Sequence, residues 1–145
     1  MKKATLILLL ITSVFAGCKC AKSDTTSTAT IYDNGWELEY LSGTRIAFEG
    51  LYPETKPTIQ FDKTEMRISG NSSCNGYSGD FTLTENQIKV GEIMQTMRFC
   101  EGGGEQSFQT MLKKINKYSF DSEGKLLLLI DDIPMMRFKK IAKRQ

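Results

Sequence analysis

The chain has 145 residues, with 19 lysines and arginines, 17 aspartates and glutamates, and no histidine. This length is typical of a single domain with a modest core. The absence of histidine excludes Ser-His-Asp and Cys-His nucleophile systems and removes the commonest zinc ligand. The near balance of charge gives no general attraction to nucleic acid, so we expect no nucleic-acid partner.

Residues 1–17 have the composition of an export signal. Lys2 and Lys3 supply positive charge, and the apolar run that follows, residues 4–15, is too short to span a bilayer comfortably. These features favour a signal that is cleaved over a permanent transmembrane anchor.

The residues at the end of this signal predict lipidation. Ala16 and Gly17 are small and stand directly before Cys18, an order that resembles the lipobox of bacterial lipoproteins. We therefore expect Cys18 to carry the lipid that holds the protein to a membrane of the bacterial envelope. The alternative is an ordinary cleaved signal in which Cys18 is incidental. Cys20 is a poorer lipidation site, because Lys19 would occupy the last position before the cut.

Residues 18–34 are predicted to form the lipidated N-terminus and a tether, since they are rich in serine and threonine. A flexible tether of this length would hold the domain roughly 20 Å from the anchor. The folded domain is predicted to occupy residues 35–145, as a monomer. Lys19 is not the aspartate that retains some lipoproteins in the inner membrane, so we expect the outer membrane. Cys20 is expected to stay a thiol near the membrane or to pair between molecules.

The domain is predicted to open with a strand in which Trp36, Leu38 and Tyr40 face the core, because apolar and acidic residues alternate there. The same period of two predicts further strands at residues 59–61, 66–68, 77–83 and 88–90. Gly76 and Gly79 interrupt the third of these and predict a bulge or a bend.

One segment, residues 105–116, is predicted to be helical, because apolar residues recur at three- and four-residue spacing at Phe108, Met111, Leu112 and Ile115. Gly102, Gly103 and Gly104 are expected to form a flexible start to this helix. Three strands are predicted after it, at residues 118–120, 126–130 and 136–141, with Pro134 separating the last two. The fold class predicted is therefore β-rich α+β, a small curled antiparallel sheet or barrel with one α-helix.

Cys74 and Cys100 both fall inside the predicted domain. In an oxidising envelope such a pair usually forms a disulfide. Closing a loop of this size would stabilise the fold by roughly 3–4 kcal/mol in the chain-entropy treatment.

Several short motifs follow one another in a recognisable order: Trp36-x-Leu38, Gly70, Cys74-Asn75-x-x-Ser78-Gly79-x-Phe81, Thr96-Met97-x-x-Cys100, Glu105-x-x-Phe108 with Leu112, and Leu126-x-Leu128 with Phe138. Together they resemble the META domain, also called the HslJ-like family, over residues 36–138. Ser73 is a departure, because the family usually has glycine before the cysteine.

The resemblance implies a compact β-rich fold with one helix and a pair of cysteines at Cys74 and Cys100. It also implies an envelope or secreted protein, since members of the family are of this kind. Some members are heat-inducible and some are linked to antibiotic tolerance. No catalytic activity is generally assigned to the family.

The remaining polar clusters give weak signals for chemistry. Glu37 and Glu39 share one face of a predicted strand, opposite the apolar residues, which indicates solvent exposure rather than an acid–base pair. Asp131 and Asp132 precede Pro134 and are typical of a turn.

Three further features have a functional and a structural interpretation. Glycines 102–104 before a helix could bind an anion, but acidic neighbours oppose it and a loop is favoured. Met94-x-x-Met97 could bind Cu(I), yet methionine more often fills gaps in a core. The basic cluster at residues 139–144 could contact anionic lipid, whereas a solvated terminus is the simpler account.

The sequence therefore predicts a non-catalytic envelope lipoprotein, without metal or cofactor, that acts in stress or antibiotic tolerance by binding an unidentified envelope partner. A module that binds a small apolar ligand inside a barrel is the alternative. A hydrolase that uses aspartate or glutamate is a third hypothesis and needs two carboxylates in one cleft.

Overall fold

The computed structural model describes residues 30–99 and 101–143. Within them the chain forms eight strands and two helices, and none of the helices described there has the length and apolar character needed to cross a membrane. The elements follow in the order β1 (Gly35–Leu41), α1 (Phe48–Leu51), β2 (Thr58–Asp62), β3 (Arg67–Asn71), β4 (Gly76–Thr84), β5 (Gln87–Gln95), α2 (Gly104–Leu112), β6 (Lys117–Phe120), β7 (Leu126–Ile130) and β8 (Ile133–Ile141).

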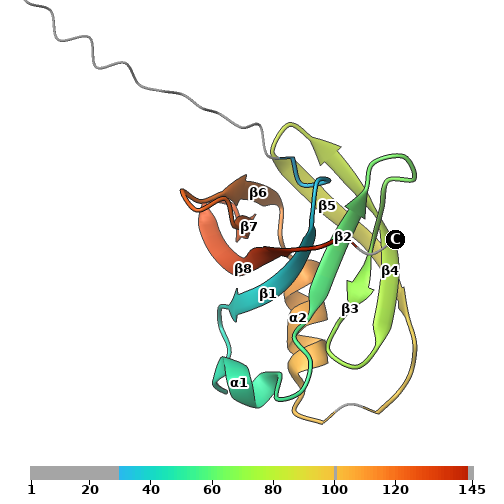
Figure 1. Ribbon diagram of the computed structural model, residues 1–145, viewed down its shortest axis with the longest axis vertical. Coiled ribbons are helices and arrows are strands. Elements are labelled where there is room, and N and C mark those ends of the chain that lie inside the picture. The colour runs from blue at the N-terminus through green and yellow to red at the C-terminus, as the bar shows by residue number, and fades with distance from the viewer. Residues whose placement is uncertain (1–29, 100, 144–145) are drawn as a thin grey trace, which may run out of the picture.

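The strands form one antiparallel sheet that curls into a ring, because each strand pairs with its neighbours in the chain and β1 also pairs with β8 (Figure 1). The ring is uneven. β4 and β5 pair along most of their length, whereas β5 and β6 pair only where Gln87 lies opposite Lys117. The predicted curled antiparallel sheet is confirmed, with the single turn α1 as a second helix that the sequence analysis did not foresee.

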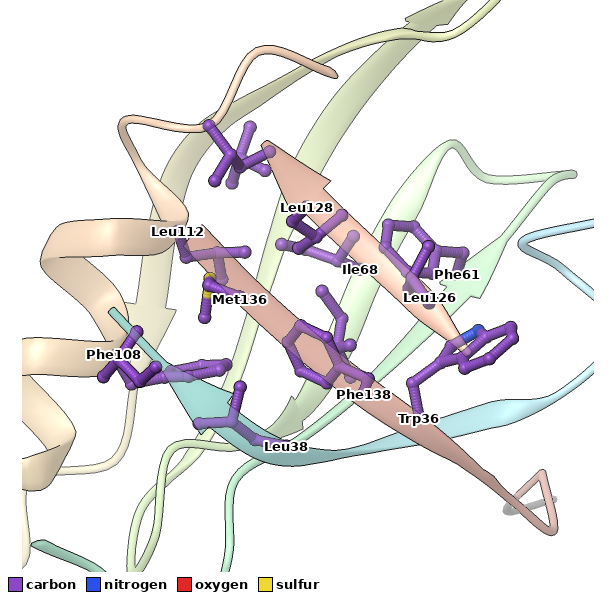
Figure 2. Close-up of a cluster of buried hydrophobic side chains, with 14 of the residues drawn as sticks. Trp36, Leu38, Phe61, Ile68, Phe108, Leu112, Leu126, Leu128, Met136 and Phe138 are labelled. Atoms are coloured by element: carbon purple, nitrogen blue, oxygen red, sulfur yellow. The ribbon is translucent and has the colours of Figure 1, made fainter. Parts of the chain in front are cut away.

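The interior of the ring is filled by the side chains that alternate along the strands. Figure 2 shows Phe138 and Met136 from β8 beside Leu128 of β7, with Ile68 and Phe61 close by. The largest fully buried side chains are apolar and come from β1, β2, β3, β7, β8 and α2 and from the segment before β1: Ile31, Trp36, Leu38, Ile59, Phe61, Ile68, Phe108, Leu112, Leu126, Leu128, Met136 and Phe138. Burial of apolar area on this scale is the main stabilising term of the fold.

Helix α2 connects β5 to β6, where the ring is least paired, and buries Phe108 and Leu112 against the core. It ends at Leu112, earlier than the predicted residue 116. The chain turns there because the N–H groups of Lys114 and Ile115 both bond to the carbonyl of Met111. Ile115 is still buried, so its apolar spacing reflects burial in the turn and not a further helical residue.

A bulge in β1 changes the faces that the alternation predicts. In β1 the register with β8 shifts between Leu38 and Tyr40, so that Leu41 is buried and Tyr40 is 46% exposed. The prediction that Tyr40 faces the core was therefore wrong. The register of β4 with β5 shifts between Gly79 and Phe81, but the extra residue lies in β5, where three steps from Val90 to Ile93 oppose two steps in β4. The buried face of β4 is unchanged, so the irregularity falls beside Gly79 but in the partner strand.

Pro134 was predicted to separate the last two strands, but the structure places it within a strand. It lies inside β8 opposite Leu129, next to a register shift between Leu128 and Leu129. A proline is tolerated at such an irregularity because no regular ladder hydrogen bond is required of its nitrogen. The turn before it, at Asp131, has a positive φ of 55°.

The segment just before β1, which the sequence analysis assigned to the tether, packs on the domain. Ile31 is buried in the core, and its carbonyl accepts a hydrogen bond of 2.9 Å from the indole N–H of Trp36. The hydroxyl of Thr30 donates to the Asp33 carboxylate at 2.7 Å. The packed part of the chain therefore extends to residue 30, upstream of the predicted boundary at residue 35.

Candidate interaction site

The side chain of Asn75, in the turn between β3 and β4, is the centre of a buried polar network. Its amide nitrogen donates to the carbonyl of Arg98 at 2.8 Å and to the carboxylate of Glu105 at 3.0 Å. Its amide oxygen accepts from the hydroxyl of Thr96 at 2.7 Å and from the Arg98 N–H at 2.8 Å. Asn75 is only 1% exposed, so these bonds replace the water that its amide would otherwise bind.

Ser72 extends the network to the start of α2. Its hydroxyl donates to the second carboxylate oxygen of Glu105 at 2.6 Å, and its N–H donates to the carbonyl of Asn75 at 2.9 Å. Ser72 is fully buried, and no buried side-chain nitrogen or oxygen within residues 30–99 and 101–143 lacks a hydrogen-bond partner. We call these five residues, Ser72, Asn75, Thr96, Arg98 and Glu105, the Asn75 network.

The segment after β5 is held by this network although it has no regular secondary structure. The N–H of Thr96 donates to the carbonyl of Gly76 at 3.0 Å. The Arg98 guanidinium donates to the carbonyl of Cys74 at 2.6 Å, and the sulfur of Cys74 lies 3.7 Å from the carbonyl oxygen of Phe99. The backbone of residues 96–99 is thereby fixed against the β3–β4 turn.

Three large apolar side chains stand in solvent here, Met94 near the end of β5 and Met97 and Phe99 on the fixed segment. Met94 is 64% exposed, Met97 is 87% exposed and Phe99 is 90% exposed. We call these three residues the apolar tip. The interpretation of Met94 and Met97 as residues that fill the core is wrong, because neither is buried. Phe99 was not among the residues predicted to be functional.

A cleft of about 700 Å³ adjoins the apolar tip and opens to solvent. Its wall includes Gln60, Ser69, Ser78 and Met94, which lie in register across β2, β3, β4 and β5. Gln60, Ser69 and Ser78 each follow a buried residue and therefore face away from the core, and Met94, which lies opposite Ser78, is exposed. The cleft is polar along most of this row and apolar where it meets the tip.

Glycine is required where β3 crosses closest to β2. A Cβ at Gly70 would lie 2.0 Å from the carbonyl oxygen of Thr58, which is far inside van der Waals contact. The hydroxyl of Tyr77 donates to the same oxygen at 3.0 Å, and burial raises the pKa of Tyr77 well above its usual range. The phenol therefore stays protonated and remains a hydrogen-bond donor.

Of the three glycines at the start of α2, Gly104 is packed, whereas Gly102 and Gly103 are exposed. A Cβ at Gly104 would lie 2.3 Å from the carbonyl oxygen of Leu51, and the hydroxyl of Tyr52 donates to the Gly104 carbonyl at 2.8 Å. Gly102 and Gly103 have φ values of 88° and 68°, which suit glycine. This packing fixes the position of Glu105 at the first turn of the helix.

The paired carboxylates of β1 hold ion pairs outside the ring. Glu37 lies 2.9 Å from Lys139, and Glu39 lies 2.6 Å from Arg137 and 3.0 Å from Lys125. Burial alone would raise the pKa of Glu39, but hydrogen bonds from Lys125 and Arg137 outweigh it and hold the pKa below its usual value. Both carboxylates therefore pair with cations across β1 and β8.

Asp131 and Asp132 lie in the predicted turn. The carboxylate of Asp131 accepts a hydrogen bond of 2.9 Å from the Asn116 side chain, and Asp132 lies 2.8 Å from Lys117. Neither carboxylate is brought together with Glu37 or Glu39 by any contact in the described residues.

Two predicted site residues, Cys18 and Cys100, lie outside the described residues, as does Cys20, which was not assigned to a site. The lipidation of Cys18 and the pairing of Cys74 with Cys100 therefore stay predictions. For the second, the short distance between Cys74 and the carbonyl of Phe99 places the chain neighbour of Cys100 beside the Cys74 sulfur.

Comparison with known proteins identifies the family. Residues 29–142 match the sequence model of the META domain. The chain belongs to the META domain family. The motifs that carry the resemblance supply most of the Asn75 network, namely Asn75, Thr96 and Glu105. No curated protein sequence matches the chain.

Solved structures share the fold at low sequence identity. A protein from Burkholderia xenovorans solved by NMR is 20% identical, with a TM-score of 0.59 over 78% of this chain and 85% of that chain. A DUF4847 family protein from Bacteroides vulgatus, solved by crystallography, is 13% identical, with a TM-score of 0.51 over 79% of this chain and 96% of that chain. At these identities the likeness extends to the fold alone.

Replacing Asn75 with aspartate tests the network with almost no change of shape. The variant loses the donor to the Arg98 carbonyl and places a second carboxylate against Glu105. We expect the free energy of unfolding at pH 7 to fall by about 3 kcal/mol or more. Asn86, in the exposed β4–β5 turn, supplies the matched control, and Asn86→Asp should change stability by less than about 0.5 kcal/mol. Equal urea denaturation midpoints for the two variants would contradict the role of Asn75.

Proposed function

We propose that this META domain is a non-catalytic envelope module that binds another envelope protein through the apolar tip. The observation that carries the proposal is the exposure of Met97 and Phe99 on a backbone fixed by the Asn75 network. Exposed aromatic and methionine side chains are enriched at protein interfaces. A backbone that is already ordered loses little conformational entropy when a partner binds, so more of the contact energy appears as affinity.

The adjoining cleft supports a protein as the partner. An interface usually combines an apolar centre with a polar surround. The apolar tip would supply the centre, and the row of Gln60, Ser69 and Ser78 would supply polar groups beside it. The sheet supplies the polar row, and the end of β5 with the segment that follows it supplies the apolar tip.

The arrangement of the charged groups supports a role without catalysis. Glu37 and Glu39 are engaged by cations, and Glu105 accepts hydrogen bonds from Ser72 and Asn75. The chain has no histidine that could act as a general base near neutral pH. A hydrolase would need two carboxylates that converge on one cleft. In this structure Glu37 and Glu39 instead take part in separate ion pairs.

The alternative function, binding of an apolar ligand inside the ring, is disfavoured by the packing. Trp36, Phe61, Phe138 and their neighbours occupy the interior (Figure 2), and the clefts of about 700 and 440 Å³ both open at the surface. A ligand inside the ring would have to displace several of these side chains, each of which contributes about 1.5–3 kcal/mol through burial.

The envelope location is proposed from the signal at residues 1–17 and the lipidation site at Cys18. The blue start of the described chain lies at the top of Figure 1, whereas α2 begins at the bottom, where Glu105 joins the Asn75 network. A lipid anchor attached through a tether at the start of the domain would leave the opposite end, with the apolar tip, accessible to an envelope partner. Stress or antibiotic tolerance is the process in which we place this binding.

In-cell crosslinking of the tagged, full-length protein tests partner binding. Replacing Met97 and Phe99 with serine should reduce the recovery of a crosslinked envelope protein by about tenfold or more, since interface anchors of this kind often contribute 2 kcal/mol. The control is Ile133→Ser, because Ile133 is 65% exposed and lies away from the tip. The same partner recovered equally with both variants would contradict the proposal.

The anchor has a separate test. Cys18→Ser should move the protein from the membrane fraction to the soluble fraction of the envelope, because the variant has no thiol at residue 18 to carry lipid. Lys19→Ala is a suitable control, since it alters a neighbouring residue but keeps the cysteine. Retention of the Cys18→Ser protein in membranes at the level of the control would contradict lipidation at Cys18.

A further inference from the structure

A second cleft lies between the chain that links β1 to α1 and one face of α2. Its volume is about 440 Å³, which falls in the range of small-molecule sites. The floor is apolar and is formed by Leu41, Leu51 and Met111, of which the two leucines are buried. Ile46 stands at the lip and is 53% exposed.

Positive charge lines this cleft from two separate segments. Arg45 comes from the β1–α1 connection and Lys114 from the turn after α2, and both are exposed. Neither makes an ion pair with any of the residues that the structure describes. The lining contains hydroxyl groups at Ser42, Thr44, Ser107 and Thr110, and it contains no aspartate or glutamate.

We propose that this cleft binds a small amphipathic anion, an organic carboxylate or phosphate with a short apolar tail. The tail would lie on the leucines and methionine of the floor and cover Ile46. The head group would lie between the two cations. The hydroxyl groups of Ser42 and Thr110 would be additional donors, since those of Thr44 and Ser107 already donate to the carbonyls of Ile46 and Gly103. This site is separate from the apolar tip and does not depend on the proposed partner.

The combination of charges and floor distinguishes this ligand from others. A neutral amphiphile would contact the same floor but leave both cations unpaired. A cationic one would be repelled by Arg45 and Lys114. An anion without a tail would gain only the attraction of exposed charges, which is weak in water. An anion with an apolar tail would contact both the apolar floor and the two cations. It should therefore bind more tightly than a neutral amphiphile or an anion without a tail.

The test is an NMR titration of the full chain carrying Cys18→Ser, with decanoate below its micelle concentration as the probe. We expect saturable shifts at the amides of residues 42–46 and 106–114. Decanol, the neutral probe of the same length, should bind about fivefold more weakly or worse. Decyl phosphate, the second anionic probe, should perturb the same amides as decanoate.

Variants separate this site from the rest of the molecule. Arg45→Gln combined with Lys114→Gln should weaken decanoate binding by about fivefold or more and leave decanol binding unchanged. Met97→Ser combined with Phe99→Ser should leave decanoate binding unchanged. The proposal is overturned if neither anion shifts these amides, if decanol binds as tightly as decanoate, or if the charge variants bind decanoate normally.

Discussion

The burial of one asparagine amide is the constraint on which this end of the molecule depends. An amide removed from water must have its donors and acceptors satisfied, or the fold loses several kcal/mol. Asn75 meets this requirement with groups from Thr96, Arg98 and Glu105. Since these groups come from the segment after β5 and from α2, a single side chain fixes the relative positions of a turn, an irregular segment and a helix.

The rest of the fold is arranged so that this amide can be satisfied. α2 crosses the place where β5 and β6 hardly pair, and Phe108 and Leu112 hold it on the core. Gly104 lets the start of α2 approach the carbonyl of Leu51, and this approach brings Glu105 to Ser72 and Asn75. The apolar tip results from this arrangement, because the backbone of residues 96–99 is held in place while the side chains of Met97 and Phe99 remain exposed to solvent.

The strands were predictable because alternation of apolar and polar residues reports directly which face is buried. The same signal fails where the backbone is irregular. The bulge in β1 exposes Tyr40 and buries Leu41, and the register shift in β8 accommodates Pro134 within a strand. The residues of the Asn75 network were visible as motifs of a known family. Their convergence was not visible, because no local pattern tells that an asparagine will bond to a glutamate that is thirty residues away along the chain. The exposure of Met97 and Phe99 was hidden for a related reason, since apolar residues are expected inside.

The central claim is that the Asn75 network holds the backbone of the apolar tip as firmly as a strand. Native-state amide hydrogen exchange of the folded protein measures this directly. The N–H groups of Thr96 and Arg98, which bond to the Gly76 carbonyl and to the Asn75 side chain, should exchange as slowly as N–H groups inside the paired part of β4. Exchange of both at the rate of an unstructured peptide, while β4 stays protected, would show that the tip is loose and that the account is wrong.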